Sequence, residues 1–584
     1  MFRRSKMSHN SYAKQIFDNF IMSSDVVSYE DCYQLCADKS QINMLMGSDH
    51  QVIWGRRGTG KTTLQKAFTH YVNNVQSDSS LRSIYVMIAK MIPTTQELDI
   101  TGNEDKTLPV YIFSKFLAEV ISQLEQIYNQ KNLKKKDDDR FIRNYVDVVD
   151  IINNYRKKLM GLTITVNETQ AVETQKGVGY NFGVDTNISP FLLNIDSNIK
   201  SKFEKTYRHN HSLSIQGALN FSIETQAISE KMENMITALG ISRLYICIDE
   251  YAEMDKVSEF SVQSAVAQLI KQVFFKSPFF SIKISTIWNH SKLHDRGENK
   301  IQGIEYKHDI FPGPDLDIMF MKNNNDVIRY FKNLLLNTYA LNHNVPVHDF
   351  AALGDFFENH IFGAKNLRCL ICGSQGISRT FVVMAKQYLS AFLEGNGEPL
   401  KISTVYDMIK NQYIENVRIK IPHLMIDDCI QEFIYERKCR YFLISRNDYQ
   451  RCKSTIKQLS TMGAFIQLPS HLTAARIRGK YKLFIINYGY YLEVMEESSR
   501  KKGIKILSED GSLTFEDMLF PPCPEDLLNN PKDYCVTFPI NSENEVYCPK
   551  CQKSFIAEKS KKIVDCDCGN KIYKFNYFSE IVAL

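Results

Sequence analysis

The stretch "VIWGRRGTGKTT", residues 52–63, decides the fold of this 584-residue chain. Gly55, Gly60, Lys61 and Thr62 fit the pattern G-x-x-x-x-G-K-[ST], in which glycines let the backbone turn tightly so that successive N–H groups face one concavity. Such a concavity at the start of a helix suits phosphate. The apolar residues before the loop predict a strand, and the spacing of apolar residues in 62–72 predicts a helix. Lys61 is expected to reach the β- and γ-phosphates of a nucleotide.

A second stretch, "RLYICIDEYAEM" at residues 243–254, supplies the acidic groups that such a loop needs. Its apolar run ends in Asp249 and Glu250, which predicts a buried parallel strand with the Walker B arrangement. Asp249 is expected to hold Mg²⁺ through water, and Glu250 to orient the attacking water as general base. The predicted site for ATP and Mg²⁺ comprises Gly55, Gly58, Thr59, Gly60, Lys61, Thr62, Thr63 and Asp249, with Thr62 and Asp249 serving the metal.

A third apolar stretch, "FFSIKISTIWNHSKL" at residues 279–293, predicts a strand whose tip carries the polar residues Thr286 and Asn289. In additional-strand ATPases a polar side chain at this place contacts the γ-phosphate and the attacking water, and we assign that role to Asn289. A plain core strand with a polar tip is the alternative.

These motifs and a later "GISR" at residues 376–379 form an ordered set that resembles the AAA+ ATPases. The initiators of the origin-recognition and replication-licensing group, with their bacterial relatives, are the most similar clade, and the resemblance covers roughly residues 30–500. It implies a parallel-sheet α/β core, then a helical lid, then a winged-helix domain that binds DNA. It also implies that Arg379 is the second sensor, which reaches the γ-phosphate; a surface arginine at a helix start is the alternative.

The chain departs from that family pattern in two respects. The interval from Lys61 to Asp249 is far longer than one strand and one helix require, so we expect an insertion at about residues 131–240. Within it, residues 163–225 fit either the strands of a hairpin or a region that becomes ordered on a partner. No arginine finger is evident, because Arg296 and Arg329 are candidates by position alone. Assembly into a homo-oligomer therefore stays open.

Positive charge is concentrated in one segment of a chain whose net charge is only +5. Residues 437–505 contain fifteen Lys or Arg and four Asp or Glu, a local net charge of +11. We predict a winged helix at residues 403–490, with helices at 402–417, 427–443 and 448–463 and a basic turn between two strands. The candidate nucleic-acid contacts are Arg451, Lys453, Lys457, Arg476, Arg478, Lys480 and Lys482. Duplex DNA is the expected partner; a solvated basic face or a surface that docks an acidic partner is the alternative.

Four of the fourteen cysteines crowd the C-terminal region. Cys548 and Cys551 form C-x-x-C, and Cys566 and Cys568 form a shorter C-x-C-G. Four thiolates in two close pairs suit tetrahedral Zn²⁺ and leave no open coordination position, so we predict a structural zinc ribbon. The remaining cysteines, including the pairs Cys369/Cys372 and Cys32/Cys36, are expected to be buried thiols.

Composition and length place these motifs in a cytoplasmic protein of several domains. No apolar run is long enough to span a bilayer, and the basic N-terminus lacks the apolar core of a secretory signal. The expected fold is α/β: a P-loop (AAA+, additional-strand) sheet core with a lid, a winged helix and a zinc ribbon. The expected segments are 1–50 (helical lead-in), 51–320 (ATPase core), 321–400 (lid), 401–500 (winged helix), 501–540 (linker) and 541–584 (ribbon).

Two hypotheses of function follow from the motifs. The first is an ATPase that binds nucleic acid and whose nucleotide state controls the arrangement of its domains. The second is a slow, nucleotide-gated signalling switch, whose insertion and zinc ribbon bind protein partners. The absence of an evident arginine finger favours the switch, whereas the +11 segment favours DNA. The sequence offers no motif that supports a nuclease.

Overall fold

The chain is described here by a computed structural model in which two compact units are distinguished. Ser24–Asp317 form the first, called the sheet unit below, and Met1–Ser23 with Ile318–Leu584 form the second, called the helix-rich unit. The described residues are 8–20, 26–93, 104–159, 225–256, 261–287, 290–296, 301–317, 324–341, 349–395, 397–420, 427–437, 439–453, 456, 459–460, 462–467, 480–494, 525–537, 545–558 and 563–574. Among these residues, no helix combines the length and the apolar character needed to cross a bilayer.

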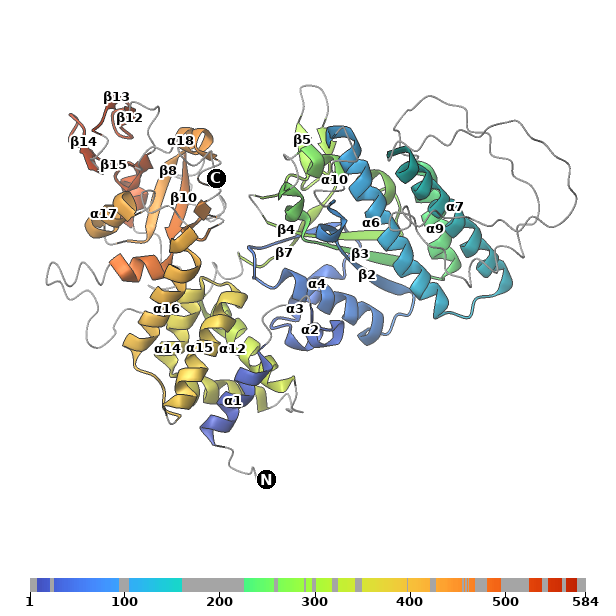
Figure 1. Ribbon diagram of the computed structural model, residues 1–584, viewed down its shortest axis with the longest axis horizontal. Coiled ribbons are helices and arrows are strands. Elements are labelled where there is room, and N and C mark those ends of the chain that lie inside the picture. The colour runs from blue at the N-terminus through green and yellow to red at the C-terminus, as the bar shows by residue number, and fades with distance from the viewer. Residues whose placement is uncertain are drawn as a thin grey trace, which may run out of the picture. The chain divides into compact units, whose positions relative to one another are not determined.

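A five-stranded parallel sheet is the centre of the sheet unit (Figure 1). The strand order is β2 (Leu81–Met87), β3 (Arg243–Asp249), β4 (Phe280–Thr286), β1 (Gln51–Trp54) and β7 (Phe311–Asp315). β4 therefore lies between the strand that precedes the glycine-rich loop and the strand that ends in Asp249, as the additional-strand prediction requires. Because all five strands are parallel, the loop and the two carboxylates leave the sheet at the same edge.

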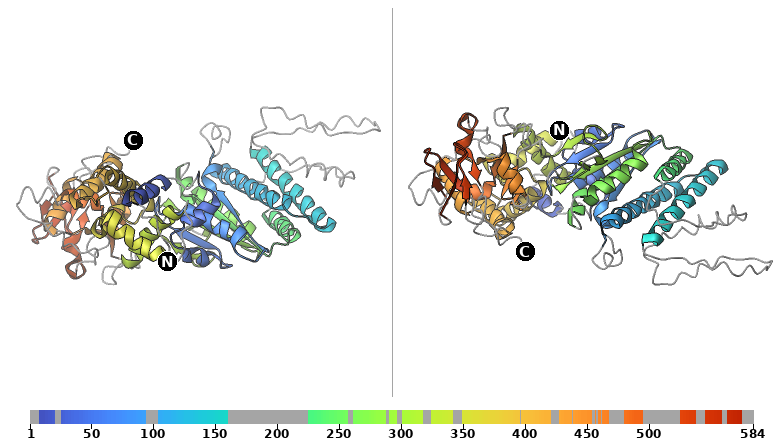
Figure 2. Two further views of the ribbon diagram at one scale, coloured as in Figure 1. Left: turned by 90° about the horizontal axis from the view of Figure 1, so that it is seen from below. Right: turned by 90° about the horizontal axis from the view of Figure 1, so that it is seen from above.

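Helices cover both faces of this sheet (Figures 1 and 2). Consecutive strand residues point to opposite faces, so Val52 and Ile53 enter two different apolar clusters. One face packs on α2 (Tyr29–Leu35), α3 (Ser40–Leu45) and α4 (Lys61–His70). The other packs on α6 (Glu104–Asn129), α9 (Thr225–Ala238) and α10 (Ser261–Phe274). Burial on both faces explains why the strands are nearly continuous apolar runs.

The expected insertion is helical in its described part. α7 (Lys135–Leu159) packs against α6 and α9 through Phe141, whose ring stacks on Tyr128 with centroids 4.3 Å apart. The stretch 163–225, for which strands or a partner-ordered region were alternatives, lies outside the described residues except for Thr225. A small antiparallel pair, β5 (His294–Arg296) and β6 (Ile301–Gly303), packs against α10.

The helix-rich unit begins with a bundle that the N-terminal helix completes. α1 (His9–Asn19) packs on α12 (Asn324–Ala340) and α15 (Ser378–Glu394), so the first fifty residues are shared between the two units. The bundle also contains α13 (Phe350–Phe356), α14 (Ala364–Ser374) and α16 (Ile402–Asn416). Its core is apolar and includes the buried thiols of Cys369 and Cys372, as predicted.

A winged helix follows, with element bounds that differ from the prediction. The order is α17 (Asp427–Arg437), β8 (Tyr441–Ser445), α18 (Arg446–Arg451), a helical segment to residue 460, β9 (Phe465–Gln467) and β10 (Tyr481–Ile486). The strands form an antiparallel sheet of order β8-β10-β9. The prediction of one helix over 427–443 is wrong, because the buried aromatic and branched residues of "YFLIS" form β8. α16 packs mainly in the bundle, and α17 is the first helix of the winged helix.

The C-terminal segment forms short strands around the cysteines. β12 (Glu545–Tyr547) pairs with β13 (Ser554–Ile556), and β14 (Ile563–Asp565) pairs with β15 (Lys571–Lys574), both antiparallel. β11 (Val536–Thr537) runs parallel to β15. This pattern of two hairpins, each carrying one cysteine pair, confirms the ribbon that the cysteine spacing predicts.

Candidate nucleotide site, basic face and metal centre

The glycine-rich loop has the backbone that its sequence demands. Gly58 and Gly60 have φ of 80° and 98°, values that side-chain-bearing residues rarely adopt, and α4 begins immediately after Gly60. A Cβ at Gly55 would lie 2.5 Å from Thr59 Oγ1, so only glycine fits where the loop folds back on itself. The loop therefore folds back on itself before α4 begins. The first backbone N–H groups of α4 follow directly and suit a phosphate.

The Lys61 side chain lies within the loop. Its ammonium donates hydrogen bonds to the carbonyl oxygens of Gly55 at 2.7 Å and Arg56 at 2.8 Å. Burial lowers the pKa of Lys61 to about 8, although the nearby carboxylates of Asp249 and Asp317 act in the opposite direction. A phosphate that entered the loop would replace two neutral acceptors with a charged one, which favours the protonated amine.

Asp249 is the most highly bonded carboxylate of the site. Its Oδ2 accepts hydrogen bonds from Thr62 Oγ1 at 2.6 Å and from the Tyr85 hydroxyl at 2.8 Å. Its Oδ1 accepts from the Ser285 hydroxyl and from the backbone N–H of Glu250, the latter at 2.9 Å. The four donors come from α4, β2, β4 and the turn after β3, so the carboxylate is fixed beside the loop. Tyr85 and Ser285 were not predicted, since a tyrosine and a serine inside apolar strands give no signal in sequence.

Glu250 and the polar end of β4 are the remaining predicted parts of the nucleotide site. Glu250 has a φ of 58°, in the left-handed region that is unusual for a residue with a side chain. The chain therefore turns sharply between the two carboxylates. Thr286 ends β4, and its hydroxyl is hydrogen-bonded to that of Ser291. Asn289, to which we assign the polar-tip role, lies outside the described residues.

The predicted arginines fall in different places. Arg379 is exposed as the second residue of α15 and belongs to the helix-rich unit. Arg329 lies on α12 of the same unit, where its Nη2 pairs with Asp326 Oδ1 at 2.6 Å. Arg296 ends β5 in the sheet unit. The roles of all three arginines stay predictions.

Two acidic residues hold the arginines of the loop itself. Asp317 accepts from both the backbone N–H and the Nε of Arg56, each at 2.8 Å. Glu253 pairs with Arg57 Nη2 at 2.6 Å. Sequence reasoning missed both contacts, because the loop motif places no requirement on these two positions.

A cluster of cations marks one face of the winged helix. Arg446, Lys453 and Lys480 are exposed, and the backbone N–H of Arg446 donates to the Lys480 carbonyl at 2.9 Å. Lys482 lies with its ammonium 5.4 Å from the centre of the Tyr449 ring. Burial lowers the pKa of Lys482, and the charges of Arg446 and Lys453 lower it further, which places the three cations together. We call Arg446, Lys453, Lys480 and Lys482 the basic face.

The basic face differs in part from the predicted contacts. Arg446 was not predicted, and it joins the cluster because it begins the short helix α18. Arg451 was predicted, but it forms an ion pair with Asp448. Lys457, Arg476 and Arg478 lie outside the described residues.

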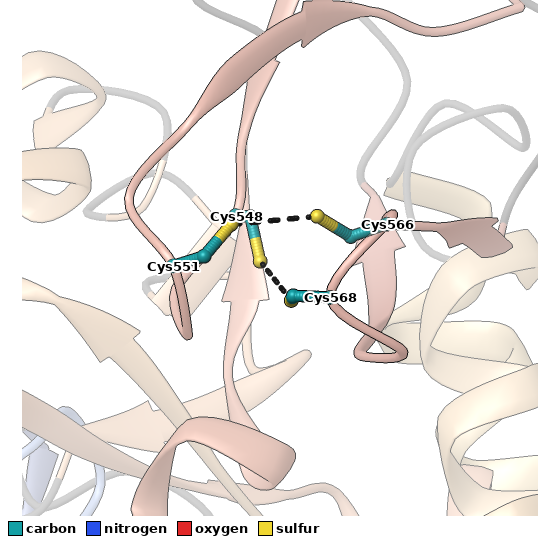
Figure 3. Close-up of side chains that lie close together, drawn as sticks. All are labelled: Cys548, Cys551, Cys566 and Cys568. Atoms are coloured by element: carbon teal, nitrogen blue, oxygen red, sulfur yellow. Dashed lines mark hydrogen bonds between the residues drawn. The ribbon is translucent and has the colours of Figure 1, made fainter.

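The four C-terminal cysteines converge on one point (Figure 3). All their Sγ atoms lie within 4.8 Å of one another, with Cys548 and Cys568 at 3.6 Å and Cys551 and Cys566 at 3.5 Å. A tetrahedral zinc with bonds of about 2.3 Å requires sulfur–sulfur distances of about 3.8 Å. The four thiols therefore fit Zn²⁺, and among the described residues this is the one cluster of His, Cys, Asp or Glu suited to a metal.

The two cysteine pairs have equivalent turns despite their different spacing. Cys548 N–H donates to the Lys553 carbonyl and Cys566 N–H to the Asn570 carbonyl, both at 3.0 Å. The residue after the second cysteine of each pair has a positive φ, 63° at Gln552 and 77° at Gly569. A hydrogen bond from the Lys553 backbone N–H is the main cause that lowers the pKa of Cys551 to about 7. The short C-x-C-G pair thus forms the same kind of turn as C-x-x-C.

The ribbon shares a core with the winged helix. The Tyr573 ring lies 5.2 Å from that of Phe433 on α17, and both belong to the apolar cluster of the winged helix. Glu436, also on α17, accepts hydrogen bonds from Lys571 Nζ at 2.8 Å and from the Tyr573 hydroxyl at 2.7 Å. Burial raises the pKa of Glu436, but these two donors outweigh it and hold the pKa below its usual value. An isolated parallel β-bridge between Leu443 and Cys535 also joins β8 to the segment just before β11.

Comparisons with known proteins found similar solved structures only. Neither protein-family models nor curated proteins gave a match. The Aeropyrum pernix ORC1 protein in complex with DNA is similar at 11% identity and a TM-score of 0.26, covering 81% of this chain and 92% of that chain. The Aeropyrum pernix ORC2 protein, in its ADPNP-ADP complexes, is similar at 11% identity and a TM-score of 0.27, covering 84% of this chain and 98% of that chain.

Proposed function

We propose that this protein is an ATPase whose nucleotide state controls a winged-helix domain that binds duplex DNA. The observation that carries the proposal is the hydrogen bond between Thr62 and Asp249 beside the buried Lys61 ammonium. A hydroxyl and a carboxylate in contact, next to a lysine inside a glycine-rich loop, form a site for a metal–triphosphate complex.

The reaction converts ATP and water to ADP and phosphate. Each residue of the site has a separate role in it. Thr62 and Asp249 are the groups that hold Mg²⁺, which supplies charge neutralisation at the β- and γ-phosphates. Lys61 moves from the loop carbonyls to the phosphate oxygens. Glu250 accepts a proton from the attacking water and so directs its oxygen at the γ-phosphorus. Tyr85 and Ser285 keep Asp249 oriented throughout.

The basic face supports nucleic acid as the partner of the winged helix. Three exposed cations and one half-buried cation gather around α18 and the start of β10. Cations in that arrangement contact phosphates of the backbone and carry no sequence preference themselves. The four cysteines hold a structural zinc in this proposal, because four thiolates leave no position for a substrate.

A specific observation favours the alternative, a nucleotide-gated switch that acts on protein partners. Tyr547 and Ile556 are 42% and 68% exposed on the β12–β13 hairpin of the ribbon, where such large apolar side chains are suited to a protein contact. In that case hydrolysis is slow and indifferent to DNA.

The steady-state ATPase rate, with and without duplex DNA at low and moderate salt, separates the two. DNA stimulation that fades with salt supports the DNA-dependent ATPase. A slow rate that DNA does not change supports the switch. Lys61→Ala is the control, and a rate that survives this substitution would refute the loop assignment.

A further inference from the structure

The phosphate loop carries two adjacent arginines whose environments differ. Arg56 is fixed: Asp317 accepts from its backbone and its side chain, and the two side chains are 20% and 9% exposed. Arg57 extends outward, with a side chain that is 58% exposed, and its Nη2 meets Glu253 Oε1 at 2.6 Å. Arg56 therefore braces the loop, whereas Arg57 has a largely exposed guanidinium that pairs with one carboxylate.

The position of Glu253 defines where the Arg57 guanidinium lies. Glu253 is in the short helix η5 (Tyr251–Lys256), and its backbone N–H donates to the Glu250 carbonyl at 2.9 Å. The ion pair thus spans from the loop to the turn that follows the two carboxylates. Arg57 is also close enough to Lys61 for its charge to lower the pKa of that lysine. Arg57 consequently stands at the mouth of the loop, between Lys61 and the residues after Glu250.

We propose that Arg57 is a γ-phosphate ligand, which exchanges its ion pair with Glu253 for the γ-phosphate when a nucleoside triphosphate binds. The inference rests on the proposed function, since it requires a nucleoside triphosphate in the loop. A partly exposed ion pair is weak, because solvent screens it. A phosphate offers a guanidinium a doubly charged acceptor with two oxygens in the geometry of its fork. Exchange of the carboxylate for a phosphate is therefore favourable when the third phosphate is present.

The same exchange distinguishes triphosphate from diphosphate. The α- and β-phosphates occupy the loop and Lys61 in both nucleotides, and only the γ-phosphate extends to its mouth. With ADP bound, Arg57 stays on Glu253. With ATP bound, Glu253 is released from Arg57. Arg57 then supplies a positive charge at the γ-phosphate from within the same chain. The sequence shows no arginine finger that would supply this charge.

The test compares the affinities of the full-length protein for Mg²⁺-ADP and for a non-hydrolysable Mg²⁺-ATP analogue by calorimetry. Arg57→Ala is expected to weaken the analogue about tenfold or more, as loss of a charge-assisted contact does, with ADP changed less than about twofold. Arg140→Ala is the matched control: Arg140 is an exposed arginine on α7 of the same unit, whose Nη2 contacts Asn234. It should leave both affinities unchanged.

A second variant acts in the opposite direction, which separates the proposal from a folding defect. Glu253→Gln removes the competitor for Arg57 and should raise the preference for the analogue over ADP by about twofold to fivefold. In the double variant Arg57→Ala/Glu253→Gln this gain should vanish. Equal weakening of both nucleotides by Arg57→Ala, or none, would overturn the role of Arg57. A wild-type protein that binds neither nucleotide would instead overturn the proposed function, and this inference with it.

Discussion

Thr62 and Asp249 are 187 positions apart in the chain, yet the Thr62 hydroxyl donates a 2.6 Å hydrogen bond to Asp249 Oδ2. The contact joins the first turn of α4 to the end of β3. Both oxygens are hard ligands of the kind that Mg²⁺ prefers, so the Thr62 hydroxyl oxygen would ligate the metal and Asp249 would hold it through water.

Thr62→Ala should therefore raise the Mg²⁺ concentration needed for tight nucleotide binding by about tenfold, since one metal ligand and one partner of Asp249 are lost. Thr62→Ser keeps the hydroxyl and should stay within about twofold of wild type. Titration of Mg²⁺ at fixed nucleotide gives both values. Equal Mg²⁺ requirements in Thr62→Ala and wild type would contradict the assignment.

Nucleotide affinity should fall as pH rises above about 8. The free protein has a Lys61 pKa of about 8, lowered by burial, and phosphate raises it by favouring the ammonium. Above that pH, binding must take up a proton, so affinity decreases by up to about tenfold per pH unit; below it, Lys61 is already charged and affinity is level. Calorimetry at about pH 7, 8 and 9 measures the trend. Lys61→Arg, which stays charged, should bind less tightly but lose the pH dependence.

Tyr85→Phe tests whether the orientation of Asp249 matters. The variant removes one of the hydroxyls bonded to Oδ2 and leaves the carboxylate its other donors. The free energy of unfolding should fall by about 1 kcal/mol, and the Mg²⁺ requirement of hydrolysis should rise a few-fold. Tyr245→Phe is the control, because its hydroxyl bonds to the Met46 carbonyl instead. Identical Mg²⁺ curves for the two variants would rule out the orienting role.

One zinc per chain should be found by elemental analysis, and Cys548→Ser should lose most of it. Cys452→Ser is the matched control, since that cysteine is a free thiol outside the cluster. Because the ribbon shares a core with the winged helix, metal loss should also lower the unfolding temperature of the helix-rich unit. Equal metal content in both variants would show that the cluster does not bind zinc.

Charge reversal on the basic face should weaken DNA binding. Arg446→Glu combined with Lys453→Glu removes two phosphate contacts, so the slope of log affinity against log salt should become shallower by about 2. Lys365→Glu combined with Lys386→Glu, on α14 and α15 of the bundle, makes the same change in net charge and is the control. An unchanged affinity and slope would mean that DNA, if bound, contacts another surface.

Much of this fold was predictable because its strands and motifs are local patterns. The strand at 243–249 was recognisable from its apolar run, and the loop from its glycines. The bonds to Asp249 from Tyr85 and Ser285 were not, because they depend on which strands are neighbours in the sheet. No short-range pattern specifies that β4 lies beside β3.

In the winged helix, the local pattern predicted a helix that is too long. Residues 427–443 have a helical pattern, and nothing local says that the helix ends at Arg437. β8 forms because Tyr441 and Leu443 pair with β10, some forty residues later in the chain. Arg446 was missed as a member of the basic face, since its place there depends on where α18 begins.

The last strand of the ribbon also bears on how the chain is made. Tyr573 joins the apolar cluster around α17, and until it is synthesised Phe433 lacks one of its ring contacts and Glu436 lacks its hydroxyl donor. On a ribosome, the helices and strands of the winged helix emerge well before β15 does. The winged helix therefore gains these contacts only after its own helices and strands have been made, and a chain terminated before β15 would expose that part of the core to proteases.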